Sequence, residues 1–143
     1  SVAPSFSGQT DRHVTMDNAD PKDRLQWCLS NGEIDGATDL IEKQGMDVNG
    51  QLNTGRCPIH YAADNGQNAI IEYLVGKGAE VDKMDKHGIT AIQAAIWEGH
   101  VETVQLLLAK GASKDGTSPD GRPYLATVDD AERNQAELKR VLA

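Results

Sequence analysis

Apolar residues recur along this chain at the spacing of an α-helix. One run, with intervals of three, three and one, consists of Val101, Val104, Leu107 and Leu108. Such intervals place all four side chains on one helix face. The same intervals start at Ile34, Asn68 and Gln135, and the polar Asn68 and Gln135 stand where a helix end still reaches water. The pattern predicts four helices of one kind, at nearly even spacing along the chain.

Each unit also carries a shorter, alanine-rich helix. The clearest example spans 91–98, where Thr90 is placed to accept a hydrogen bond from a first-turn amide and Gly99 is placed to end the helix. The small pairs Ala62–Ala63 and Ala94–Ala95 allow neighbouring helices to approach closely. The predicted unit is therefore a turn, a short helix, a tight turn, a long helix and a loop.

This unit repeats at a fixed period along the chain. Gly55, Gly88 and Gly121 are evenly spaced and lie in segments rich in turn-forming residues. Aligning residues 52–84 with 85–117 gives nine identities, where about two are expected from ordinary residue usage. The chain therefore contains a true internal repeat.

The segments Cys57–Ala62 and Thr90–Ala95 match a Thr-Pro-Leu-His-x-Ala pattern to different degrees. A 33-residue unit of one turn and two helices with this segment resembles the ankyrin repeat. The resemblance implies an all-α solenoid of stacked helical hairpins with polar capping units at its ends. We expect a flexible segment at 1–21 and an ankyrin-repeat domain at 22–143, divided into capping units at 22–51 and 118–143 and full repeats at 52–84 and 85–117.

Composition narrows the class of partner. Hydrophobic residues make up 38% of the chain and aromatic residues only 4%, so the core must be aliphatic. The formal net charge of −8 argues against binding to a nucleic-acid backbone and favours a basic protein partner. Two isolated cysteines and the lack of a long apolar run predict reduced thiols and a cytoplasmic location, with a nuclear one left open.

Several runs carry a closer resemblance, to a subgroup of small, free-standing ankyrin proteins. They lie at 27–32, 55–64, 85–90, 98–101 and 119–121, and the similarity fades across 122–134. The resemblance implies a module, monomeric when free, that binds the heterodimeric actin-capping protein and keeps it from filament barbed ends. The alternative is an ankyrin-type inhibitor or regulator of a kinase or of a Rel-type transcription factor.

Exposed positions near the turn glycines and at the ends of the short helices are the candidate protein-binding residues. They are Trp27, Arg56, Asp64, Lys86, His87, Trp97 and Glu98. Trp97 is the strongest candidate because tryptophan is enriched at interface hot spots, although it could instead pack across the preceding unit. Trp27 could equally cover the open end of the core. Arg56 could bind a partner carboxylate or pair with a local acid such as Asp64.

The sequence offers little for catalysis or metal binding. Asp64, His60 and Ser118 can be written as a triad, but their units place Ser118 two repeats from His60. Cys57 and His60 have a C-x-x-H spacing, but no second pair supplies the remaining ligands that zinc needs. We therefore predict no enzyme, no metal and no cofactor, a structural role for the buried His60 ring, and a local capping role for His100.

Overall fold

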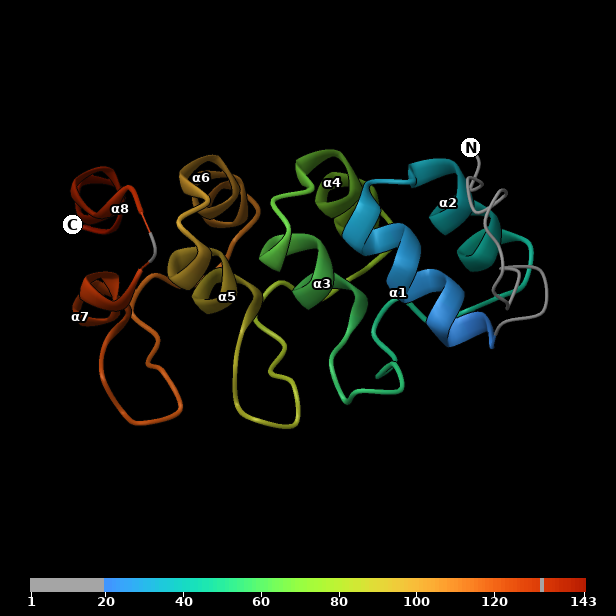
Figure 1. Cartoon of the computed structure of the whole chain (residues 1–143), viewed down its shortest axis with the longest axis horizontal. Helices are drawn as coiled ribbons and strands as arrows, with labels where there is room; N and C mark the ends of the chain where they lie inside the picture. Colours follow the sequence, from blue (N-terminus) through green and yellow to red (C-terminus); the bar gives the residue numbers. More distant parts are fainter. Residues whose placement is uncertain (1–19, 132) are drawn as a thin grey trace, which may run out of the picture.

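The computed structural model describes residues 20–131 and 133–143, which form helices stacked in two layers (Figure 1). One layer, which we call the short-helix layer, holds the first helix of each unit: α1 (Pro21–Asn31), α3 (Pro58–Asp64), α5 (Ala91–Glu98) and α7 (Tyr124–Thr127), the last continued by the 3-10 turn η3 (Val128–Asp130). The other layer holds the second helix of each unit: α2 (Ile34–Glu42), α4 (Asn68–Gly76), α6 (Val101–Ala109) and α8 (Gln135–Leu142). The predicted difference in length is wrong for the first unit, because α1 has 11 residues and α2 has nine. Neighbouring helices pack in sequence order, α1 on α3, α3 on α5 and α5 on α7.

The all-α solenoid predicted from the repeat is confirmed for the described part of the chain. In these residues the only β pairing is an isolated bridge between Thr117 and Pro123. Residues 1–19 of the predicted flexible segment lie outside the description. The unit boundaries stay a prediction.

The four apolar runs form α2, α4, α6 and α8, and each helix begins at the first residue of its run. Their central positions are buried and join one continuous core with the short helices. The buried members are Ala37, Leu40, Ile41, Ile71, Leu74, Val104, Leu107, Leu138 and Leu142. The core is mainly aliphatic, as the composition predicts, and Tyr61 and Tyr124 are its buried aromatic residues.

The predicted start and end of α5 are also confirmed. The Thr90 hydroxyl accepts a hydrogen bond from the Gln93 N–H at 3.4 Å, which satisfies one of the free amides of the first turn. Gly99 ends the helix in the left-handed region, with φ +78°, a conformation that costs glycine little.

His60 joins the start of α3 to the loop before the next unit. Its ring is fully buried, and Nδ1 accepts a hydrogen bond from the Cys57 N–H at 3.0 Å. The proton therefore sits on Nε2, which donates to the Lys83 carbonyl at 2.9 Å. Burial lowers the pKa of the ring below its ordinary value, so the imidazole is held neutral. The predicted structural role of His60 agrees with this arrangement.

A second set of links lies at the N-terminal ends of α4, α6 and α8. The cap residue of each helix bonds a carbonyl at the end of the first helix of the preceding unit: Gln67 bonds Ser30 at 3.2 Å, His100 bonds Asp64 at 3.0 Å and Asn134 bonds Gly99 at 2.8 Å. His100 stands at the cap position, but its side chain makes no cap hydrogen bond. The local capping role predicted for it is wrong, because the ring bonds the preceding unit instead.

We expect His60 to make folding depend on pH. Below pH 6.5 the unfolded chain binds a proton that the folded ring, with its lowered pKa, does not bind. The free energy of unfolding should therefore fall as the pH drops from about 6.5 through the folded pKa. His60→Gln should flatten this dependence, and His60→Ala should cost about 2–4 kcal/mol through lost hydrogen bonds and a cavity.

Urea unfolding measured between acid and neutral pH tests this expectation. The exposed His87 provides the matched control, because His87→Gln should leave the free energy of unfolding nearly unchanged. An unaltered pH dependence in His60→Gln would contradict the assignment.

Candidate protein-binding surface

Three similar turns project from the short-helix layer, at 52–56, 85–89 and 118–122. In each, the N–H of the first residue donates to the carbonyl of the fifth, at 2.8, 3.0 and 2.8 Å in chain order. The fourth residue is a glycine with φ of +88°, +79° and +89° in turn. The second and third residues of every turn are exposed, so each turn offers a two-residue tip.

The tips of the first and second turns touch one another. The Lys86 N–H donates to the Gly55 carbonyl at 3.2 Å, and the aliphatic stem of Lys86 lies across Gly55. A Cβ at Gly55 would come within 2.4 Å of Lys86 Cδ, so this close approach requires glycine. Lys86 is exposed at its tip and its neighbour His87 is exposed beside it.

Arg56 connects the first turn to α3 and to the second turn. Its NH2 lies 3.9 Å from Asp64 Oδ1, and its Nε lies 3.8 Å from the buried carboxylate of Asp85. The guanidinium also sits 4.9 Å from the centre of the Tyr61 ring, within the range of a cation–π contact. Of the two interpretations of Arg56, the local ion pair with Asp64 is therefore present in the folded chain.

The buried side chain of Asp85 holds the backbone of the second turn by hydrogen bonds. Its Oδ1 accepts hydrogen bonds from the His87 N–H at 2.8 Å and the Ile89 N–H at 3.0 Å. Its Oδ2 is buried with no hydrogen-bond partner in the described structure, so the nearby Arg56 supplies its compensating charge.

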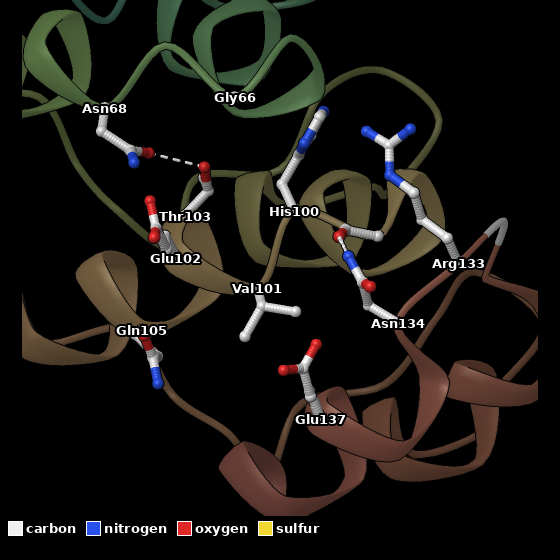
Figure 2. Close-up of a pocket in the computed structure, with 11 residues that line it drawn as sticks. Gly66, Asn68, His100, Val101, Glu102, Thr103, Gln105, Arg133, Asn134 and Glu137 are labelled. Carbon is white, nitrogen blue, oxygen red and sulfur yellow. Dashed lines mark hydrogen bonds between the residues drawn. The ribbon is translucent and has the colours of Figure 1, made fainter.

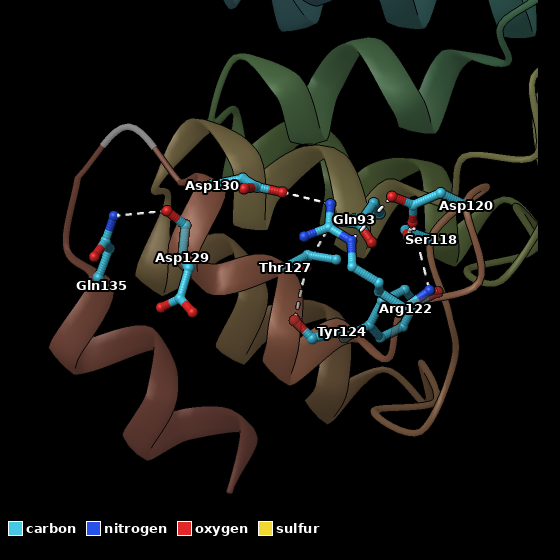
Figure 3. Close-up of polar contacts among 9 residues, drawn as sticks. All are labelled: Gln93, Ser118, Asp120, Arg122, Tyr124, Thr127, Asp129, Asp130 and Gln135. Carbon is cyan, nitrogen blue, oxygen red and sulfur yellow. Dashed lines mark hydrogen bonds and ion pairs between the residues drawn. The ribbon is translucent and has the colours of Figure 1, made fainter.

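The third turn carries a cluster of ion pairs with shorter contacts than those of Arg56 (Figure 3). Arg122 donates from Nε to Asp120 at 2.9 Å and from NH2 to Asp130 at 2.5 Å. The Ser118 hydroxyl also donates to Asp120, and this bond, followed by those from Arg122, lowers the pKa of the Asp120 carboxyl. The cluster fixes the turn to η3.

A buried polar contact lies beneath this turn. The Tyr124 and Thr90 hydroxyls are 2.7 Å apart, and Gln93 Nε2 donates to the Thr127 hydroxyl at 3.0 Å. Burial raises the pKa of Tyr124, which keeps its hydroxyl protonated. Gln93 Oε1 has no hydrogen-bond partner in the described part of the molecule.

Trp97 and Glu98 are the last two residues of α5, and both are half-buried. Trp27 is half-buried on α1 and packs against the core, which favours a covering role for it. The structure thus gathers Arg56, Asp64 and Lys86 around the first two turns, but places Trp27 among the core contacts of α1. The choice between a binding and a packing role for Trp97 stays open.

Sequence reasoning missed the roles of Asp85, Arg122 and Asp130 on this surface. The repeat period was a usable signal for two of them, because Arg122 and Asp130 stand two periods after Arg56 and Asp64. Asp85 gave no such signal, since the equivalent positions hold leucine and serine.

Cys57 and His60, which have the C-x-x-H spacing, make hydrogen bonds to the backbone instead of binding a metal. Both ring nitrogens of His60 bond backbone groups, and the Cys57 thiol donates to the Asn49 carbonyl at 3.4 Å. Burial raises the pKa of Cys28 and of Cys57, so both stay thiols rather than reactive thiolates. Within residues 20–131 and 133–143, no three His, Cys, Asp or Glu side chains group as metal ligands.

An open hollow of about 460 Å³ lies where the short helices turn into the longer ones (Figure 2). His100 reaches it from one unit, and Arg133 and Asn134 reach it from the next. Beside it, the Thr103 hydroxyl donates to Asn68 at 2.6 Å. Its lining is mostly polar, so it lacks the enclosed apolar character of a small-molecule site. No helix in the described structure is long and apolar enough to cross a membrane.

A two-layered stack of turn and helix-pair units is the architecture of the ankyrin repeat. A family model described as ankyrin repeats in three copies matches residues 25–118, and the chain belongs to this family.

Among known proteins, myotrophin from Xenopus tropicalis is 45% identical over 53 residues, which cover 37% of this chain and 44% of that protein. Serine/threonine-protein kinase 12 from Arabidopsis thaliana is 29% identical over 135 residues, 94% of this chain and 29% of the kinase. Human ankyrin repeat domain-containing protein 63 is 30% identical over 124 residues, 76% of this chain and 32% of that protein. The chain spans less than half the length of each.

The two turn arginines should differ in their effect on stability. Arg56→Ala leaves the buried Asp85 carboxylate without its cation, so we expect a loss of about 2–4 kcal/mol. Arg122→Ala removes exposed ion pairs and should cost about 1 kcal/mol or less. Chemical unfolding of both variants measures the difference, and equal losses would contradict a special role for the Arg56–Asp85 pair.

Proposed function

We propose that this chain is a protein-binding module that sequesters the heterodimeric actin-capping protein away from filament barbed ends. The observation that carries the proposal is the similarity to myotrophin, 45% identity over 53 residues. The resemblance found in the sequence implies a protein that binds capping protein. The exposed turn tips and the half-buried ends of the short helices offer a surface for such a partner.

The mechanism we propose is occlusion. The surface formed by Arg56, Asp64, Lys86, His87, Trp97 and Glu98 covers the face with which capping protein would hold a filament end. Trp27 at the end of the stack would extend this surface only at its margin, because the ring packs against the core. No bond is made or broken, so the module acts in proportion to its concentration.

Charge supports a basic partner. The formal net charge of −8 attracts a cationic surface, which raises the association rate and makes it fall with added salt. A cytoplasmic location and a monomeric free state are part of this proposal, since capping protein is met in the cytoplasm and the surface must be uncovered.

A seeded actin assay tests sequestration. When capping protein is mixed with this chain before filament seeds are added, the barbed ends should keep growing, and the half-maximal concentration of this chain should rise with salt. Growth that stays fully capped at saturating protein would contradict the proposal and leave the kinase or Rel-type regulator as the alternative.

Trp97→Ala should separate binding from folding. We expect it to weaken the complex with capping protein by about 2 kcal/mol or more, with little change in melting temperature. Tyr73→Ala removes a half-buried aromatic ring from α4, in the opposite layer, and should leave binding unchanged. Calorimetry for binding and thermal unfolding for stability measure both quantities. Parallel loss of stability and binding in Trp97→Ala would support the packing role instead.

A further inference from the structure

The loops that follow α4 and α6 each bond back to the preceding unit. After α4, the Glu80 N–H donates to the side-chain oxygen of Asn49 at 2.9 Å. After α6, the Ser113 N–H donates to the two carboxylate oxygens of Asp82 at 3.2 and 3.3 Å. Glu80 and Ser113 stand one repeat period apart, and so do Asn49 and Asp82. The two bonds are therefore the same link at successive junctions.

The two links place one negative charge on opposite sides of the bond. In the first link the donor residue Glu80 has the charge, and the acceptor Asn49 is neutral. In the second link the acceptor Asp82 has the charge, and the donor residue Ser113 is neutral. A negative charge added at Ser113 would therefore face a carboxylate, which a charge at Glu80 does not.

The fold of this loop accommodates an acidic group at the position of Ser113. One period before Glu80 stands Asp47, whose carboxylate accepts a hydrogen bond from the Asn49 N–H at 2.9 Å. The Ser113 hydroxyl makes the equivalent contact and accepts from the Asp115 N–H at 3.2 Å. Two of the three equivalent positions thus hold a carboxylate, and the third holds a hydroxyl, the group that a kinase phosphorylates.

Ser113 is accessible and lies between two cations. It is exposed in the irregular segment 110–116, with the exposed Lys110 three residues before it and the exposed Lys114 directly after it. The other exposed hydroxyl residues in the described part of the chain, Thr54 and Thr117, do not have a basic residue within three positions on both sides. A kinase with an acidic substrate groove would therefore select Ser113 among them.

We infer that Ser113 is the acceptor of a serine/threonine kinase that selects basic residues on both sides of the serine. The kinase transfers the γ-phosphoryl group of Mg-ATP to Ser113 Oγ. A bond forms between this oxygen and phosphorus, the bond to the β-phosphate oxygen of ATP breaks, ADP leaves, and the hydroxyl proton passes to the catalytic aspartate of the kinase.

The phosphate loosens the junction between the two units. It adds a charge of about −1.5 to −2 beside the Asp82 carboxylate, which weakens the bond from the Ser113 N–H by like-charge repulsion. The adjacent Lys114 offsets part of this charge. Lys114 now donates to the Ala143 carbonyl at 2.9 Å, so its turn toward the phosphate breaks a second contact of this loop.

A double-mutant cycle tests the charge argument without a kinase. Ser113→Glu should melt about 2 °C or more below the neutral Ser113→Gln, because two carboxylates then share the junction. In the Asp82→Asn background the same two variants should differ by less than about 1 °C, since asparagine and glutamate reproduce the Asn49–Glu80 link. Added salt should reduce the first difference.

A kinase assay on the intact chain tests the site. The enzymes are the catalytic domains of cyclic-AMP-dependent kinase, calcium/calmodulin-dependent kinase and protein kinase C, each with Mg-ATP, and mass spectrometry locates the phosphate. At least one enzyme should modify Ser113, and Ser113→Ala should remove this phosphate. The phosphorylated chain should melt below the unmodified chain.

Matched lysine variants test the selection of Ser113 by charge. Lys110→Gln with Lys114→Gln should lower the initial rate about fivefold or more. Lys43→Gln with Lys77→Gln removes the same charge after α2 and α4 and should leave the rate within about a factor of two.

Three outcomes would overturn the inference: no phosphate on Ser113 with any of the three enzymes, equal slowing by the two lysine variants, or equal differences in melting temperature in the two backgrounds of the cycle. Ser113 and Asp82 lie outside the candidate binding residues, so these results do not depend on the outcome of the actin assay.

Discussion

Each helical hairpin in this chain has an apolar face that it cannot bury alone. Leu74 of α4 and Leu107 of α6 are completely buried only because neighbouring units pack over them. Burial of such side chains is worth about 1.5–3 kcal/mol each, so stacking is the main source of stability in this architecture. Every polar feature of the surface, from the turn tips to the ion pairs, depends on the spacing that this stacking sets.

Hydrogen bonds from polar side chains fix how neighbouring units are aligned in the stack. His60, Gln67, His100 and Asn134 each bond a carbonyl in a neighbouring unit or loop. A buried or half-buried carbonyl without a partner would cost free energy, so these bonds favour one register over slipped alternatives. They also hold the ends of the short helices at fixed positions, which gives the candidate binding surface its shape.

Much of the fold could be predicted from the sequence because its signals are local. The intervals of the run that starts at Val101, and the Thr90 and Gly99 ends of α5, lie within single helices. The links between units could not be predicted in the same way. Whether His100 caps its own helix or reaches Asp64 depends on the position of another unit, which no local pattern describes. The Arg122–Asp130 pair was predictable only by carrying Arg56 and Asp64 forward by two periods.

The orphaned Gln93 oxygen has a consequence for how the solenoid comes apart. His60 satisfies both of its polar atoms, whereas Gln93 at the equivalent position leaves Oε1 without a partner among the described residues. In a linear array, opening begins at the junction with the smallest interaction energy. The C-terminal hairpin should therefore fray before the others, and amide exchange should be fastest in α7 and α8.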